Sequence, residues 1–391
     1  MVESAMIGRI VVDLVILLSS TGIVVVHVAL YGGLAAVLRS QRRGRRTGRS
    51  GTERAHSVCL VVPARNEAEG LPRLFASFER QTRRDFSVVL IDDRSSDGTP
   101  SIMEEFSKRH DGMVKIIRLS AEDAVPGRNP KQNALTHGVA RADAEILLFT
   151  DADCEVPPTW IEDMAACYDD ESLGLVIGAI ITRQDGGAAS RFHAFDHIFK
   201  YAYTAGSIGI GLPTGGFGNN LSIRRAALDE VGGFEALGNS TTEDAALIAA
   251  VRVRTSWRVG ALLSERTLVR TAPLASFREI ASQEVRWHIG GLFSTDVSTR
   301  LSYGYLMLYL TASIAAVAPS FFHPLFAVMP ATSFLTMGVM ALIAGAATSR
   351  PVRPFWRWFL PDLILTMCFN AYLTVRALTR RRVTWKGSTL G

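Results

Sequence analysis

The run from Leu14 to Leu38 contains no charged residue and is long enough to span a lipid bilayer as a helix. Arginines cluster after it from Arg39 onward, whereas a signal peptide carries basic residues before its apolar run and a small-residue cleavage site after it. By the positive-inside rule, the amino terminus lies outside and the chain after Leu38 lies in the cytoplasm. We therefore predict an integral protein of a bacterial-type inner or plasma membrane.

A second apolar region follows Leu301. Residues 303–322 and 325–347 each reach membrane-spanning length, and the short His323-Pro324 break between them predicts a hairpin. The stretch 358–378 is also apolar, but polar residues and a proline interrupt it and arginines flank it on both sides. One of these three segments is therefore a candidate for a re-entrant or interfacial helix.

Between the apolar regions the pattern changes to a soluble α/β alternation. Strand, helix and strand at this spacing predict a parallel, Rossmann-like sheet. No Gly-x-Gly-x-x-Gly follows the first strand, which argues against a dinucleotide cofactor. The expected strands are 58–62, 86–91, 114–118, 145–150 and 173–182, and the expected helices are 69–81, 99–109 and 129–141.

The formal net charge is +5, and its basic runs adjoin apolar segments. A membrane surface is therefore a better partner than nucleic acid, which we do not expect to bind. The four cysteines have no metal-like or redox spacing, and free thiols are expected.

Two carboxylates, Asp151 and Asp153, directly follow the predicted strand 145–150. Ligands of open α/β sheets bind outside the carboxyl ends of the strands. This acidic pair is therefore placed to hold Mg²⁺ or Mn²⁺ and, through the cation, a diphosphate. Taken alone, such a pair is more often a solvated loop after a strand than a metal site.

Three further motifs carry charge in the soluble region. Asp92-Asp93 ends the second strand, where it could also cap the turn before Ser95. Glu243-Asp244 could be the acidic first turn of a helix. Gln283, Arg286 and Trp287 share one helical face, on which a guanidinium and an indole can hold a phosphate and a sugar or acceptor. The Gly-rich stretch 205–218 is either a flexible connector or an acceptor-binding loop.

Together, these motifs resemble those of membrane-bound family 2 glycosyltransferases, a group that includes ceramide glucosyltransferases, cellulose and hyaluronan synthases, and bacterial lipid and carotenoid glycosyltransferases. The resemblance covers residues 58–293, in family order. It implies a GT-A fold, a nucleotide-sugar donor, a divalent cation and inversion at the anomeric carbon. Its motifs are Val61-Val62-Pro63-Ala64-Arg65-Asn66-Glu67, Ile91-Asp92-Asp93, Thr150-Asp151-Ala152-Asp153, Gly218-Asn219-Asn220, Val231-Gly232-Gly233-Phe234, Thr242-Glu243-Asp244 and Gln-x-x-Arg-Trp.

The resemblance also implies a role for each matching residue. Asp153 resembles the metal ligand and Asp244 the general base. Lys131 resembles the lysine near the diphosphate, although the usual Gly-Lys is Pro-Lys here. The nucleotide-sugar site then consists of Pro63, Arg65, Glu67, Asp92, Asp93, Lys131 and Asp151, with Asp93 favoured over Asp92 for the uracil. Gln283, Arg286 and Trp287 resemble the box at the acceptor and diphosphate end.

We therefore predict an inverting glycosyltransferase that moves a sugar from a UDP-sugar to a membrane-associated lipid acceptor at the cytoplasmic face. The alternative within the same family is a processive polysaccharide synthase. It is disfavoured because such an enzyme needs more membrane spans, which form a channel for the polymer. A non-catalytic nucleotide-sugar-binding membrane protein is a further alternative. The terminal Val-Thr-Trp-Lys-Gly resembles a tail of lipid and carotenoid glycosyltransferases.

The predicted regions of the chain are a transmembrane helix (1–38), a basic linker (39–56), a GT-A domain (57–300), membrane segments (301–378) and a basic tail (379–391).

Overall fold

The centre of the molecule is a seven-stranded sheet with the strand order β3-β2-β1-β4-β7-β5-β8. The computed structural model describes residues 2–46, 56–184, 187–238, 240, 242–347, 356–379, 383–385 and 388–390. Strands β3, β2, β1 and β4 are mutually parallel, and β7 runs antiparallel to both of its neighbours. The predicted α/β class is therefore confirmed, and the predicted parallel, Rossmann-like pairing holds for β3, β2, β1 and β4, whereas β7 makes the whole sheet mixed.

The main sheet contains the strands that the apolar runs predicted. In the described chain, β10 pairs with β11 and β6 pairs with β9 outside the main sheet. The strands are β1 (Val58–Ala64), β2 (Ser87–Asp93), β3 (Val114–Leu119), β4 (Ile146–Phe149), β5 (Leu173–Gly178), β6 (Ile180–Thr182), β7 (Leu221–Arg224), β8 (Arg258–Leu262), β9 (Val269–Thr271), β10 (Val383–Trp385) and β11 (Ser388–Leu390).

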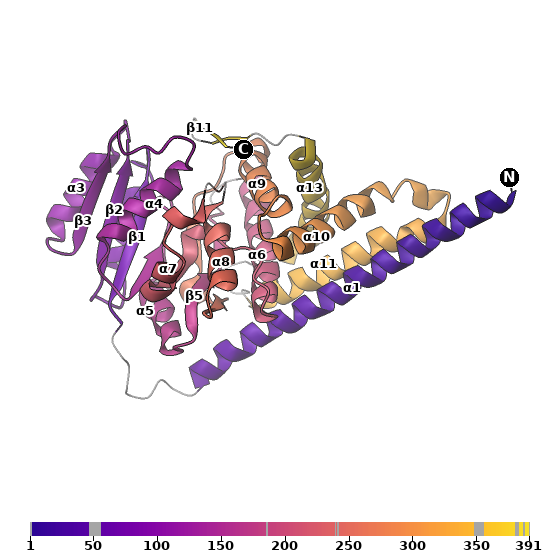
Figure 1. The fold of residues 1–391 in the computed structure, drawn as a ribbon, viewed down its shortest axis with the longest axis horizontal. Helices are drawn as coiled ribbons and strands as arrows, with labels where there is room; N and C mark the ends of the chain where they lie inside the picture. Colours follow the sequence, from indigo (N-terminus) through magenta and orange to yellow (C-terminus); the bar gives the residue numbers. More distant parts are fainter. Residues whose placement is uncertain are drawn as a thin grey trace.

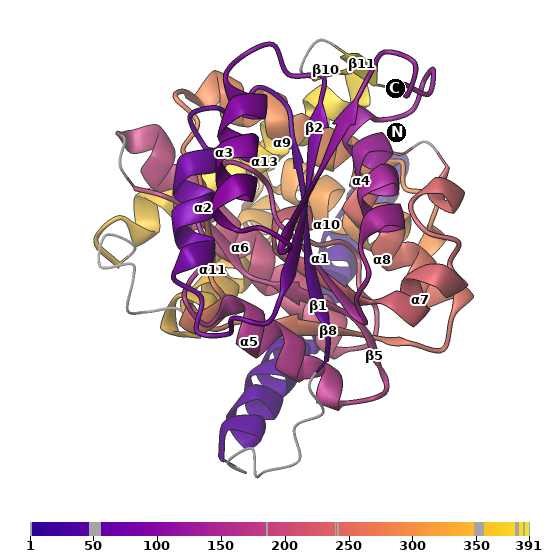
Figure 2. The ribbon, with the colours of Figure 1, turned by 90° about the vertical axis from the view of Figure 1, so that its left-hand side faces the viewer.

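Helices cover both faces of this sheet, with α2 and α3 on one face and α4, α7 and α8 on the other (Figure 2). The helices of the soluble part are α2 (Leu71–Glu79), α3 (Thr99–Arg109), α4 (Pro130–Arg141), α5 (Trp160–Ala165), α6 (Ala188–Gly209), α7 (Arg225–Glu230), α8 (Glu243–Arg254) and α9 (Phe277–Leu292). Because both faces are covered, β1 is buried along nearly its whole length, as its continuous apolar sequence requires.

The predicted strand 173–182 is two strands, because the chain leaves the main sheet at Ala179. The side-chain amide of Asn220 donates to the Ala179 carbonyl over 2.7 Å. The side chain of Asn220 also fills the space beside Gly178, where a Cβ would lie 2.3 Å from its amide nitrogen. This packed side chain fixes the point at which β5 ends and β6 turns toward β9.

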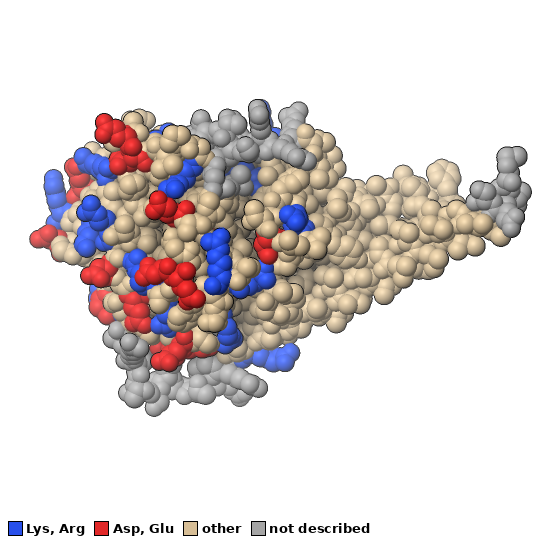
Figure 3. Space-filling model, in the orientation of Figure 1, with Lys and Arg blue, Asp and Glu red and all other residues tan. Residues whose placement is uncertain are grey.

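The remaining helices form an apolar extension at the far end of the molecule (Figure 1). Helix α1 (Val2–Arg46) runs along it, and α10 (Val297–Ala315) and α11 (Val328–Ala347) lie beside α1, while α13 (Phe359–Thr379) packs on α9 and α10. On the face drawn in Figure 3, acidic and basic side chains gather over the sheet domain, while the extension carries almost none.

Among the described helices, two are long and apolar enough to cross a membrane, at Met6–Gln41 and Pro324–Ala347. The predicted span 303–322 does not form one helix, because α10 starts earlier and ends at Ala315, before Pro319 begins a 3₁₀ turn. The break at His323-Pro324 does separate two neighbouring helices, as predicted. Apart from its first residue, the stretch 358–378 lies in one continuous helix, α13, despite its internal polar residues.

The Gly-rich stretch 205–218 is not wholly a connector, because its first part belongs to α6. Here α6 crosses α1 so closely that a Cβ on Gly33 would lie 2.1 Å from the carbonyl oxygen of Gly206. A Cβ on Gly209 would lie equally close to the carbonyl oxygen of Gly33. These glycines therefore serve backbone packing rather than loop flexibility.

The predicted boundaries at 38, 56, 300 and 378 remain predictions. Helix α1 extends past Leu38 to Arg46. Much of the predicted basic linker and tail, including the Lys-Gly of the terminal motif, lies outside the described residues.

Candidate active site

A cavity of about 430 Å³ opens where β1, β2 and β4 end, which is the edge at which an α/β sheet binds ligands. It brings together nearly all of the predicted site residues. Asp92 is the exception among them, because its carboxylate instead accepts a hydrogen bond from the backbone N–H of Ser95 over 3.0 Å. The predicted residues that line this cleft are Pro63, Arg65, Glu67, Asp93, Lys131, Asp151, Asp153, Asp244, Gln283, Arg286 and Trp287.

The loop after β1 is tied to the loop after β2. Asn66 has a positive φ of 56°, and its backbone N–H donates to the Ser95 hydroxyl over 3.0 Å. The N–H of Glu67 donates to the Thr99 hydroxyl over 2.7 Å, and that of Ala68 donates to Asp97 over 3.1 Å. These contacts hold Arg65 and Glu67 at the cleft without using the charged side chains themselves.

Asp93 lies in the same wall and is buried. The guanidinium of Arg94 donates to its carboxylate over 2.7 and 2.8 Å. The neighbouring acids therefore have different surroundings: Asp92 stabilises the turn and Asp93 faces the cleft. Asp93 is the residue that the resemblance favoured for the uracil, and that role stays a prediction.

Lys131 joins two elements that are distant in the sequence. The Asn129 side chain caps α4 by accepting from the Lys131 N–H, and the Lys131 ammonium lies 2.6 Å from Asp151 and 3.3 Å from Glu243. Burial alone lowers the pKa of Lys131, but the charges of Asp151 and Glu243 outweigh it and raise that pKa. The lysine is therefore a permanent cation in the cleft.

Asp153 completes an acidic wall. Its carboxylate accepts from the Thr271 hydroxyl over 3.1 Å. Burial, together with the charge of Asp151, raises the pKa of Asp153. A divalent cation would relieve this repulsion, and Mg²⁺ binds through one or two carboxylates plus substrate phosphates. The described residues hold no ready-made cluster of three or more His, Cys, Asp or Glu, so the other ligands would be phosphate and water oxygens.

Asp244 lies in the first turn of α8 and faces the cleft. Its two carboxylate oxygens each accept from a backbone N–H over 2.8 Å, one from Gly218 and the other from Ala245. Burial and the adjacent charge of Glu243 raise the pKa of Asp244 to about 6. The residue is thus both the acidic first turn that we considered and a carboxylate suited to accept a proton near neutral pH.

The predicted box lies on α9, with Gln283, Arg286 and Trp287 on the cleft. Burial lowers the pKa of Arg286 below its ordinary value, although the charges of Glu243 and Asp244 oppose this shift. A guanidinium with so high an intrinsic pKa remains charged. Lys131 and Arg286 therefore supply two cations that can face a diphosphate.

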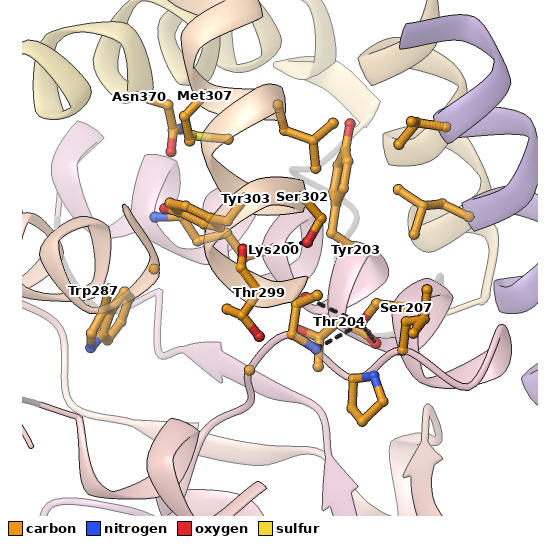
Figure 4. A pocket seen from close by; sticks show the side chains of 18 of the residues that line it. Lys200, Tyr203, Thr204, Ser207, Trp287, Thr299, Ser302, Tyr303, Met307 and Asn370 are labelled. Carbon is orange, nitrogen blue, oxygen red and sulfur yellow. Dashed lines mark hydrogen bonds between the residues drawn. The ribbon is translucent and has the colours of Figure 1, made fainter. Parts of the chain in front are cut away.

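A second cavity of about 360 Å³ adjoins the cleft on the side of α1 and α11 (Figure 4). Residues of α1, α6, α10 and α11 form its walls, and most of its lining is apolar, with exceptions such as Lys200 and Tyr303. The two cavities share one boundary. The residues that line both are Gly216, Phe217, Thr242, Asp244 and Trp287.

Glu243 and Asn129 also line the cleft, although the sequence assigned neither of them a role. Glu243 pairs with Lys131, and its other oxygen accepts from the Asn129 amide over 3.0 Å. The sequence signal was present, because Glu243 belongs to the Thr242-Glu243-Asp244 motif and Asn129 precedes the Pro-Lys pair. What the sequence lacked was the contact between α4 and α8.

Comparison with known proteins gives a family match across most of the chain. A family model described as Glycosyl transferase family 21 matches residues 22–391. Glycosyltransferase AglE of Haloferax volcanii is 26% identical over 182 residues, which cover 45% of this chain and 55% of that protein. A beta-monoglucosyldiacylglycerol synthase of Trichormus variabilis is 26% identical over 281 residues, which cover 67% and 56%.

The chain thus spans little more than half of the length of these two relatives. Among solved structures, a mannosyltransferase of Pyrobaculum calidifontis in complex with GDP-Man and Mn²⁺ aligns with 91% of this chain and 97% of its own. That alignment has 17% identity and a TM-score of 0.49.

Proposed function

This chain belongs to glycosyl transferase family 21, and from that premise we propose that it transfers a sugar from a UDP-sugar to a membrane-associated lipid acceptor at the cytoplasmic face, with inversion. Membership agrees with the predicted resemblance to membrane-bound glycosyltransferases of the ceramide glucosyltransferase kind. The proposal joins that membership to the chemistry of the two cavities.

One observation carries the proposal: a charged cleft and an apolar cavity meet at Asp244 and Trp287. The cleft offers acids and cations suited to a nucleoside diphosphate and a sugar. The cavity has walls from α1 and α11, the two helices of membrane-spanning length, and suits a hydrocarbon chain. A lipid hydroxyl at the shared boundary would reach the carboxylate of Asp244.

The reaction we propose is a single displacement. The acceptor oxygen attacks the anomeric carbon, the hydroxyl proton passes to Asp244, and the bond to the diphosphate oxygen breaks, which releases UDP. Lys131 and Arg286 stabilise the charge that develops on this leaving group. Asp244 is the sole base in this scheme and no carboxylate forms a glycosyl intermediate, so the product is inverted.

Asp153, with Asp151, would hold Mg²⁺ or Mn²⁺ against the diphosphate. When bound, such a cation supplies Lewis-acid neutralisation of the leaving group. Asp93 and the loop with Pro63, Arg65 and Glu67 would receive the nucleoside.

The test is donor turnover in detergent-solubilised full-length protein, with radiolabelled UDP- and GDP-sugars, Mn²⁺ or Mg²⁺ and a total lipid extract. We expect label in the organic phase, lost with a chelator and with Asp153→Ala. Asp143→Ala, a change at an exposed aspartate outside the cleft, is the matched control. Label only in insoluble material would instead identify a polysaccharide synthase. Nucleotide-sugar binding without turnover would indicate a non-catalytic protein.

A further inference from the structure

Three charged side chains lie behind the box of α9, outside the groups that the proposed reaction uses. The Lys200 ammonium on α6 lies 2.6 Å from Asp196 on the same helix and 2.5 Å from Glu284 on α9. Both carboxylates are fully buried, and the Asn370 amide of α13 donates to Asp196 over 3.4 Å. The cluster thus ties three helices together.

The same lysine contacts the indole of the box. The Lys200 ammonium lies 5.4 Å from the centre of the Trp287 ring, within cation–π distance. Glu284 and Trp287 are three residues apart on α9, so the acid and the indole reach Lys200 from one helical turn. Phe217 and His197 contact other parts of the ring, with ring centres 6.1 and 6.0 Å away.

The position of this contact connects it with the acceptor. Trp287 lines both cavities, whereas Lys200 lines the apolar cavity beside Tyr303 (Figure 4). Gln283 and Arg286 face the cleft. The indole is therefore part of the partition between the donor side and the apolar side, and Lys200 supports it from the apolar side.

We propose that Lys200 is a positioning residue for acceptor transfer: held between Asp196 and Glu284, it fixes the indole of Trp287 at the boundary of the two cavities. This inference rests on the proposed function, because it assigns the acceptor to that boundary. Stability alone is a weak reason for such a cluster, since apolar residues that replace buried ion pairs often preserve stability or increase it. The cluster instead has a use if it holds the Trp287 indole in one orientation at the boundary where the acceptor binds.

The substitution K200M removes the cation but leaves Asp196 and Glu284 buried without their partner, which is destabilising. The triple variant K200M/D196N/E284Q removes all three charges and restores a neutral interior. K108M, at an exposed lysine on α3, is the control. The readouts are the melting temperature, the half-saturating amounts of UDP-sugar and of total lipid extract, and acrylamide quenching of Trp287, isolated by subtracting the W287F signal.

We expect K200M/D196N/E284Q to melt near the wild type and to need an unchanged amount of UDP-sugar. It should need about ten times more lipid extract, and its indole should be quenched more readily. If the triple variant melts normally but transfers sugar and is quenched like the wild type, the cluster is merely structural and the proposal is overturned.

A second measurement needs no folded variant of the cluster. In the wild type, the anisotropy decay of Trp287 should show a restrained indole, and free rotation would overturn the proposal. Failure of the proposed function is recognised separately, because the wild type would then transfer label from no donor, while the quenching and anisotropy results would still decide whether Lys200 fixes the indole.

Discussion

The pH dependence of transfer should follow the ionisation of Asp244. The perturbation is a change of pH from 7 to 5 at saturating divalent cation. Burial and the charge of Glu243 raise the pKa of Asp244 to about 6 from the ordinary 3.8. About nine tenths of the free enzyme then carries the basic carboxylate at pH 7, and about one tenth at pH 5. We therefore expect kcat/KM to fall about tenfold over this interval.

The assay measures initial rates of label transfer to the organic phase at low donor concentration, because kcat/KM reports the free enzyme. Asp244→Asn should lower the rate by roughly 10²–10⁴-fold. It should also abolish the acidic limb of the pH profile, which is the fall of kcat/KM between pH 7 and pH 5. Asp143→Asn should retain both the rate and the limb. A wild-type kcat/KM that stays constant from pH 7 to pH 5 would refute the reasoning about Asp244.

The same shift predicts a stability effect of opposite direction. The folded state raises the pKa of Asp244, so it binds the proton more tightly than the unfolded chain does. The contribution of this group to stability is therefore fully present below about pH 4 and is lost as the pH rises to about 6. Melting temperatures across this window should show a smaller loss for Asp244→Asn than for the wild type.

Three other substitutions test separate parts of the structure. Lys131→Met should weaken the binding of UDP at least tenfold in calorimetric titration, because it removes a cation and leaves Asp151 and Glu243 facing each other. An unchanged affinity would contradict the contact assigned between Lys131 and the diphosphate. Asp153→Ala should raise the Mn²⁺ concentration needed for half-maximal turnover at least tenfold, and an unaltered metal dependence would remove it from the metal site. Gly33→Ala should lower stability by about 1–3 kcal/mol, because its Cβ would clash with the Gly206 carbonyl. At the neighbouring Gly32 a Cβ meets nothing within 4 Å, so Gly32→Ala should not lower stability. Equal melting temperatures for the two variants would contradict the close crossing of α1 and α6.

The local sequence was sufficient to predict the first half of the sheet and most of the residues that line the cleft. Continuous apolar runs predicted the buried strands, and parallel pairing brings their carboxyl ends to one edge. For this reason Asp93, Asp151 and Asp153 meet in the cleft, as expected. The box on α9 was equally accessible, because helical spacing alone places Gln283, Arg286 and Trp287 on one face.

Features that depend on contacts between distant segments were not accessible in this way. The sequence marked residues 205–218 as Gly-rich but could not show that Gly206 packs against the backbone of α1, since the crossing of two helices is a tertiary event. The end of β5 likewise depends on Asn220, more than forty residues later in the chain. Asp92 and Asp93 are adjacent in sequence, and only the folded loop separates a turn cap from a cleft residue.

The sequence by itself therefore determined the α/β class, the apolar segments at both ends and the order of the chemical motifs, because these follow from local periodicity and residue type. The tertiary structure alone decided that the cleft meets an apolar cavity at Asp244 and Trp287, and that Lys200 is enclosed by Asp196 and Glu284 behind the indole. The physical reason is that a cavity boundary and a buried ion cluster are properties of packed helices, and their members come from segments that only the folded chain brings together.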